Sequence, residues 1–149
     1  MPGHVFSQIQ LHFNWHTDGN ATVLTSDVER FVHTYIQNRC KTTGGVFFHE
    51  VGGTDDHIHL AVRIEPVVNI AKFIGDLKGS CAFETNKHFC RKLLEWQRGY
   101  GVVSFSTRHL KWVVDYIRNQ REHHKNGTSR EALEITMPEG APNKPAEAG

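Results

Sequence analysis

The sequence predicts an α+β fold in which helices cover one face of an antiparallel sheet. Stretches of alternating apolar residues indicate strands, and stretches with apolar residues three and four positions apart indicate helices. The expected order is strand, helix, strand, strand, helix, strand, which is the order of a split βαβ unit. This order predicts a ferredoxin-like sandwich, and we expect one additional helix after it.

The strands are expected where the apolar pattern has a period of two and turn residues lie at the ends. Residues 5–15 fit this pattern and predict the first strand. Residues 46–51 and the strand that contains His57 are separated by a glycine-rich turn, so they predict an antiparallel hairpin. Pro66 closes the third strand, and residues 101–106 predict the fourth.

Three helices are expected from apolar residues at helical spacing. Ser26 with Glu29 matches a capping box, and the apolar residues that follow predict a helix to about Lys41. A second helix is expected from Ile70. A third begins near Arg108, after the fourth strand, and its buried stripe is flanked by two polar side chains considered below.

The composition, 38% hydrophobic and 22% charged, predicts one soluble domain with enough apolar material for a core. We expect this domain in residues 1–127 and a largely disordered tail in residues 128–149, where Gly, Pro, Glu and Ala dominate. The absence of a long apolar run or a leader favours a cytosolic location. The three cysteines lack a Cys-x-x-Cys pair, which argues against a disulfide framework or a thiolate zinc site.

Basic residues are concentrated in one part of the chain. Residues 69–130 hold 12 lysines and arginines against 5 acidic residues, although the whole chain has a net charge of only +1. Such a block is expected where a protein meets a polyanion, and a solvated helical surface is the alternative interpretation. The candidate DNA-binding residues are Lys78, Arg91, Lys92, Arg98, Lys111, Arg118 and Arg121.

The strongest local signal is a pair of histidines in the third strand. His57 and His59 are two positions apart, so a strand points both rings to the same face, while Ile58 points to the core. On the third helix, Tyr116 and Gln120 are one turn apart and share a face at the edge of the buried stripe. The strand offers two potential metal ligands, and the helix is the segment expected to complete the site.

These motifs resemble the single-tyrosine HUH transposases of small bacterial insertion sequences, the IS200-like family. The likeness covers about residues 4–125 and rests on the His-hydrophobic-His motif of His57 and His59, followed downstream by Tyr116 and Gln120. The supporting matches are Trp15-His16-Thr17, Pro66, Leu77-Lys78-Gly79-Ser80, Trp96-x-x-Gly99-Tyr100 and Ser104. One departure is the loop after Thr17, which is Asp18-Gly19-Asn20 where many relatives have basic residues.

The resemblance implies that the protein cleaves and rejoins single-stranded DNA. Tyr116 would be the nucleophile and would form a 5′-phosphotyrosine, while His57, His59 and Gln120 would bind a divalent metal, Mg²⁺ or Mn²⁺. The implied partners are hairpins at the ends of a mobile element and a second copy of the chain in a homodimer. Whether Tyr116 acts in its own protomer or in its partner is not fixed by the resemblance.

Several alternatives remain open. The chain could be a host-resident relative that processes repeated palindromes, or a nucleic-acid binding module whose histidines are catalytically idle. Tyr100 is a rival nucleophile, although packing or base stacking suits its position better. The base that assists proton loss from Tyr116 is not identified, and His123 is a weak candidate because it is expected to face solvent.

Overall fold

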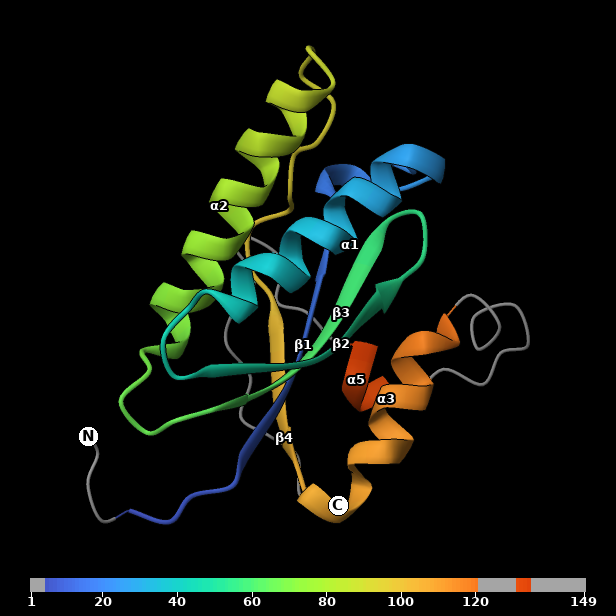
Figure 1. The fold of residues 1–149 in the computed structure, drawn as a ribbon. Helices are drawn as coiled ribbons and strands as arrows, with labels where there is room; N and C mark the ends of the chain where they lie inside the picture. Colours follow the sequence, from blue (N-terminus) through green and yellow to red (C-terminus); the bar gives the residue numbers. More distant parts are fainter. Residues whose placement is uncertain (1–4, 121–130, 135–149) are drawn as a thin grey trace.

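A computed structural model describes residues 5–120 and 131–134 of the chain. Its centre is a four-stranded sheet with the order β2-β3-β1-β4, shown in Figure 1. All three strand pairings are antiparallel, as predicted. The strands are β1 (Ile9–His16), β2 (Val46–Gly53), β3 (His57–Ile64) and β4 (Gly101–Phe105).

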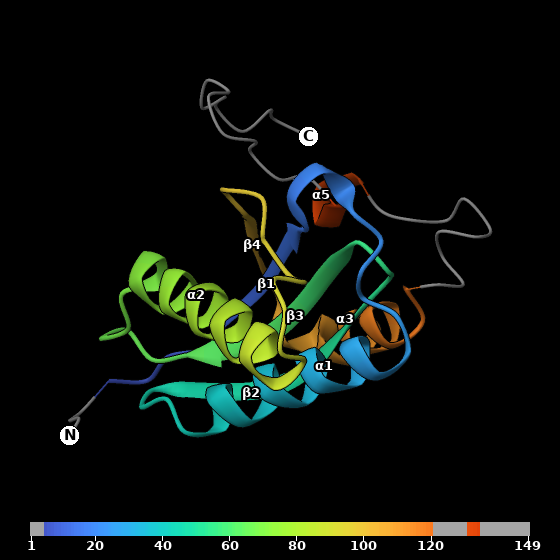
Figure 2. The same cartoon turned by 90° about the horizontal axis from the view of Figure 1, so that it is seen from above.

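Helices α1 (Ser26–Lys41) and α2 (Ile70–His88) lie side by side over one face of the sheet, as Figure 2 shows. Their buried residues join Phe13, Ile58 and Leu60 in the main hydrophobic core. The predicted sandwich of an antiparallel sheet and helices is therefore confirmed. The α1 boundaries also agree with the prediction, but the N-cap is Thr25 rather than Ser26, and the Thr25 side chain makes no capping hydrogen bond.

Two helices of the described part of the chain, α3 (Leu110–Arg118) and α5 (Glu131–Glu134), cover the opposite face of the sheet. Val113 and Ile117 of α3 pack on Ala61 of β3 and form a second, smaller apolar cluster. Because side chains alternate along a strand, Ala61 points away from the main core, on the same face as His57 and His59. The tyrosine helix and the two histidines therefore share one face.

The first strand begins at Ile9, four residues later than predicted, and both of its faces are buried. Its polar residues Gln10, His12 and Asn14 are no more than 3% exposed. The helix α5 contacts β1 and β4 on this face, although it lies within residues 128–149. The division into a domain and a tail stays a prediction, but part of the tail range is helical and lies against the sheet.

The part of the chain between α2 and β4 has no regular helix or strand beyond an isolated bridge between Thr17 and Trp96. Lys78 holds this segment, because its ammonium donates hydrogen bonds to the carbonyl oxygens of Gln97 (2.9 Å) and Gly99 (2.7 Å). Within the described ranges, no helix combines the length and the apolar character needed to cross a membrane.

Candidate metal and tyrosine site

The strand β3 places His57 and His59 next to each other on the face covered by α3. Both rings are buried, with 3% and 0% of their surface exposed. Their centroids are 5.0 Å apart. This is the arrangement predicted from their spacing in the sequence, and it brings two imidazole nitrogens to one point.

Helix α3 brings Tyr116 and Gln120 to the same place. The Gln120 Oε1 atom is 3.4 Å from His57 Nε2, and the Tyr116 ring lies 6.0 Å from the His59 ring, centroid to centroid. The helix ends at Arg118, but the Gln120 side chain stays one turn from Tyr116 because its Nε2 donates to the Tyr116 carbonyl (3.2 Å). All four residues named from the sequence are therefore in one cluster.

A glycine in β2 permits this close approach. A Cβ atom at position 52 would lie 2.4 Å from the Ile117 carbonyl oxygen and 3.0 Å from Ile117 Cγ2. Any side chain larger than hydrogen at Gly52 would therefore overlap the end of α3. The distance between the histidines of β3 and the tyrosine of α3 depends on the absence of a side chain at this position.

Glu134 of α5 is a member of the cluster that the sequence reasoning missed. Its Oε1 atom lies 3.1 Å from His59 Nε2 and 3.5 Å from His57 Nε2, and its Oε2 accepts a 2.5 Å hydrogen bond from the Tyr116 hydroxyl. Burial alone would raise the pKa of Glu134, but hydrogen bonds from His59 and Tyr116 and the charge of the histidines lower the pKa to about 2. The side chain is a carboxylate at neutral pH. Its sequence context, Glu-Ala-Leu-Glu in a tail, carried no signal.

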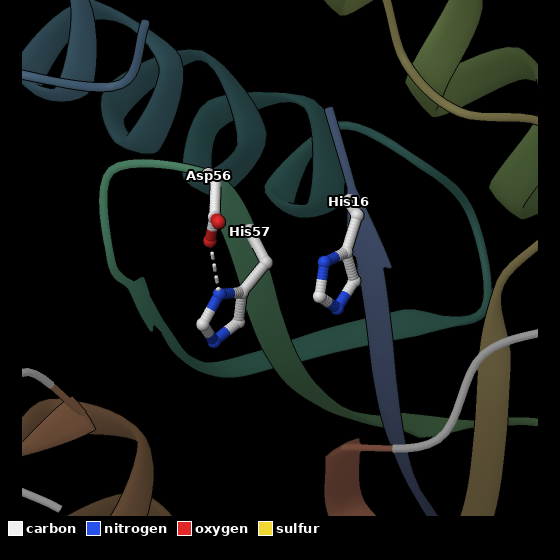
Figure 3. Close-up of side chains that lie close together, drawn as sticks. All are labelled: His16, Asp56 and His57. Carbon is white, nitrogen blue, oxygen red and sulfur yellow. Dashed lines mark hydrogen bonds and ion pairs between the residues drawn. The ribbon is translucent and has the colours of Figure 1, made fainter. Parts of the chain in front are cut away.

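Asp56 fixes the orientation of His57, as Figure 3 shows. The Asp56 Oδ1 atom is 2.8 Å from His57 Nδ1, and Thr54 Oγ1 lies within 3.2 Å of both groups. Partial burial opposes ionisation of Asp56, but hydrogen bonds from His57 and Thr54 outweigh it and lower its pKa. Because a carboxylate only accepts, Nδ1 carries a proton, and Nε2 is the ring nitrogen that is left to bind a metal. His16 stacks on His57 at 4.9 Å.

His12 of β1 orients the His59 ring, as Asp56 orients His57. Its Nε2 lies 2.8 Å from His59 Nδ1. Burial, together with the charge of His59, lowers the pKa of His12 to about 3, so His12 is neutral. When His59 Nδ1 donates to His12, His59 Nε2 is the ring nitrogen that faces the cluster. The His12 Nδ1 atom then carries the proton and has no hydrogen-bond partner among the described residues.

The donor atoms of the cluster fit a divalent metal. His57 Nε2 lies 3.4 Å from Gln120 Oε1 and 3.5 Å from Glu134 Oε1, so three potential ligand atoms converge on one point. A cation at that point would be within reach of all three. Ligands at about 2.1 Å from one ion, at right angles, are about 3 Å apart, and the observed separations of 3.1, 3.4 and 3.5 Å are close to this value.

The candidate DNA-binding residues lie at several places, and their role stays a prediction. Arg91, Lys92 and Arg98 are exposed in the segment before β4. Lys111 and Arg118 are exposed on α3 and pair with Asp115 and Glu50, respectively. Lys78 is half-buried and holds the segment at Gln97 and Gly99. Arg121 and His123 lie outside the described residues.

The remaining aromatic residues are also placed. Tyr100, the rival nucleophile, packs against the main core with its ring 6.1 Å from that of Phe13, so it lies on the other side of the sheet from the histidines. Trp112 is 46% exposed and stacks on Tyr116 at a centroid distance of 5.4 Å. Tyr116, and not Tyr100, is therefore the tyrosine that lies beside the two histidines.

The fold and the site together define an antiparallel α+β protein with a buried pair of histidines beside a buried tyrosine. The chain belongs to the IS200-like transposase family, whose sequence profile, described as "Transposase IS200 like", matches residues 5–120. It is 34% identical over 93 residues to the transposase for insertion sequence element IS200 of Salmonella typhimurium strain LT2, and equally to that of Salmonella typhi. These alignments cover 58% of this chain and 58% of the length of each relative.

Two solved structures share the fold. One is the crystal structure of a protein of Deinococcus radiodurans R1 that is assigned as a transposase, with a TM-score of 0.63 and 23% identity over 80% of this chain and 95% of that one. The other is a REP-associated tyrosine transposase bound to a REP hairpin, with a TM-score of 0.58 and 13% identity over 87% of this chain and 76% of that one. Both support the predicted fold class.

Proposed function

We propose that this protein is a DNA transposase that cleaves and rejoins single-stranded DNA through a phosphotyrosine at Tyr116. The observation that carries the proposal is the meeting of Tyr116 and Gln120 with the His57–His59 pair. Two of them, His57 and Gln120, are 63 positions apart in the sequence. A protein that only binds DNA would not need these four side chains to be buried and in contact with one another.

In the proposed reaction, the Tyr116 oxygen attacks a backbone phosphorus, and the bond from phosphorus to the 3′ oxygen breaks. The phenolic proton is lost, the leaving 3′ oxygen gains a proton, and the strand downstream of the break stays on the tyrosine through its 5′-phosphate. Attack by a different 3′-hydroxyl reverses the step and joins new ends. The phosphodiester energy is conserved in the covalent link, so no outside energy source is needed.

His57, His59 and Gln120 would hold Mg²⁺ or Mn²⁺, with Asp56 and His12 orienting the two imidazoles. The metal, when bound, would polarise the scissile phosphate and stabilise the charge that builds on its oxygens. Tyr116 is only 2% exposed, beneath Trp112 and Glu134, so the described arrangement corresponds to the protein before DNA enters. Access for the phosphate requires Trp112 to move and the hydrogen bond between the Tyr116 hydroxyl and Glu134 Oε2 to open.

We further propose that the substrate is a DNA hairpin at the end of a mobile element, and that the chain acts as a homodimer in the bacterial cytoplasm. The fold likeness to a transposase bound to a REP hairpin supports hairpin recognition. The same likeness favours a second candidate, a host-resident relative that processes repeated palindromes. The DNA that flanks the gene distinguishes the two, because an element-borne enzyme lies between its own imperfect palindromes.

Covalent capture tests the proposed chemistry. The protein is incubated with Mn²⁺ and a pool of single-stranded hairpins that includes the flanking DNA, and denatured samples are examined for a protein–DNA adduct. We expect an adduct that requires the metal, is absent in Tyr116→Phe and persists in the control Tyr100→Phe. An adduct that survives in Tyr116→Phe would contradict the assignment of the nucleophile. DNA binding without any adduct would favour the binding module.

A further inference from the structure

We propose that Glu134 is a fourth protein ligand of the divalent metal, so that α5 completes the site from beyond the tyrosine helix. This inference rests on the proposed function, because it assumes that the histidine pair binds a metal. The family resemblance implies three ligands, His57, His59 and Gln120. Glu134 would be a fourth, and it lies in the range expected from the sequence to be a tail. It also gives the carboxylate a second contact, with the reactive tyrosine.

The positions of the two carboxylate oxygens carry the inference. Oε1 faces the Nε2 atoms of both histidines at 3.1 and 3.5 Å, which are separations expected of neighbouring ligands around one ion. The ligand atoms of His57, His59 and Glu134 all lie within 4.8 Å of one another. Oε2 points the other way and accepts the Tyr116 hydroxyl. One carboxylate therefore connects the metal centre to the tyrosine.

The position of the Glu134 carboxylate depends on the contacts between α5 and the sheet. A helix of four residues has no stability of its own, so its position depends on what it packs against. Leu133 is 9% exposed, and α5 contacts β1 and β4 beside the histidines. The Glu134 side chain is 17% exposed. The carboxylate lies 3.1 and 3.5 Å from the two imidazoles, so a cation bound by both histidines would meet this anion where it already lies.

A carboxylate ligand changes which metal ions the site prefers. Two imidazoles and one amide form a neutral set, whereas Glu134 adds one negative charge and a hard oxygen donor. Hard oxygen donors favour Mg²⁺ and Mn²⁺. Metal binding should also fix α5 on the sheet, because the ion joins a residue of α5 to residues of β3. The Tyr116 hydroxyl is held by Oε2 until a phosphate oxygen replaces it.

Titration calorimetry of the full chain with MnCl₂ tests the assignment. Glu134→Gln keeps the size of the side chain and removes its charge, and Glu95→Gln makes the same change at an exposed residue next to Lys92. We expect Glu134→Gln to weaken Mn²⁺ binding by on the order of 10- to 100-fold. Removal of a residue that only hydrogen-bonds to a ligand costs this much, and removal of a ligand should cost at least as much. Glu95→Gln should bind Mn²⁺ like the wild type. Equal affinity of Glu134→Gln and the wild type would overturn the assignment.

Hydrogen exchange gives a second readout that does not depend on activity. In the wild type, Mn²⁺ should slow backbone exchange in residues 131–134, and this protection should be lost in Glu134→Gln. Wild-type protein with metal affinity but no such protection would overturn the role of α5 while leaving the proposed function intact. Wild-type protein with no Mn²⁺ affinity would overturn both. If Glu134→Gln forms the DNA adduct faster at unchanged Mn²⁺ affinity, the carboxylate is a stand-in for the scissile phosphate, and the assignment as a ligand is wrong.

Discussion

The contact between Gly52 and the end of α3 yields the sharpest prediction, because a single methyl group should displace the tyrosine. In Gly52→Ala, the new Cβ would be 2.4 Å from the Ile117 carbonyl oxygen, whereas nonbonded heavy atoms rest at about 3.5 Å. The end of α3 must therefore retreat by about 1 Å. Gly52 has no left-handed φ, so the substitution adds no backbone strain of its own.

A displacement of about 1 Å at a reacting group can lower the rate by roughly 100-fold. Tyr116 precedes Ile117 directly and Gln120 follows it closely, so both the nucleophile and a proposed metal ligand move. Overpacking should also lower the free energy of unfolding by about 1–3 kcal/mol. Since domains are commonly stable by about 5–15 kcal/mol, the variant should stay folded, and the loss of rate should not come from unfolding.

The assay is the single-turnover rate of adduct formation with Mn²⁺, measured beside a thermal melt of each variant. The matched control is Gly75→Ala in α2, because nothing lies within 4 Å of the added Cβ and alanine favours a helix interior by about 0.5–1 kcal/mol. This control should react at the wild-type rate and melt at the same or a higher temperature. A wild-type rate in Gly52→Ala would refute the argument that this contact sets the position of Tyr116.

Two further predictions concern residues that support the site. Asp56→Ala removes the partner of His57 Nδ1 and should weaken Mn²⁺ affinity by about 10- to 100-fold in calorimetry, while Asp55→Ala, its neighbour, should have no such effect. Burial lowers the pKa of Lys78 from 10.5 to about 8, so between these pH values the unfolded chain binds more protons than the folded one. The wild type should therefore gain stability as the pH rises from about 8 toward about 10.5, and denaturant melts of Lys78→Met should lack this gain. An identical pH dependence in both proteins would contradict this account of Lys78.

The sequence indicated the two halves of the site because each half lies on one regular element. A strand gives alternate residues a common face, so the spacing of His57 and His59 was enough to aim both rings the same way. A helix gives residues four apart a common face, which paired Tyr116 with Gln120. The β2–β3 hairpin and the order of the elements were also readable, since turn residues and changes of period mark their limits.

The sequence could not show which side chains complete the site, because those contacts join segments far apart in the chain. His12 lies on the buried polar face of β1, within hydrogen-bond distance of His59. The alternating pattern of β1 predicts that His12 shares a face with Gln10 and Asn14, but it does not predict which residues cover that face. The four residues of α5 have too little periodicity to predict a helix, and Glu134 lies at the histidines because α5 packs against β1 and β4.

By itself, then, the sequence determined the fold class, the motif strand and the residues that face one another on each element. The tertiary structure alone decided the distance between β3 and α3, through Gly52, and the addition of Glu134 and His12 to the cluster. The physical reason is that local backbone geometry repeats every two or 3.6 residues and can be read along the chain. Contacts across the sheet follow from how whole elements pack, and no repeat along the chain encodes them.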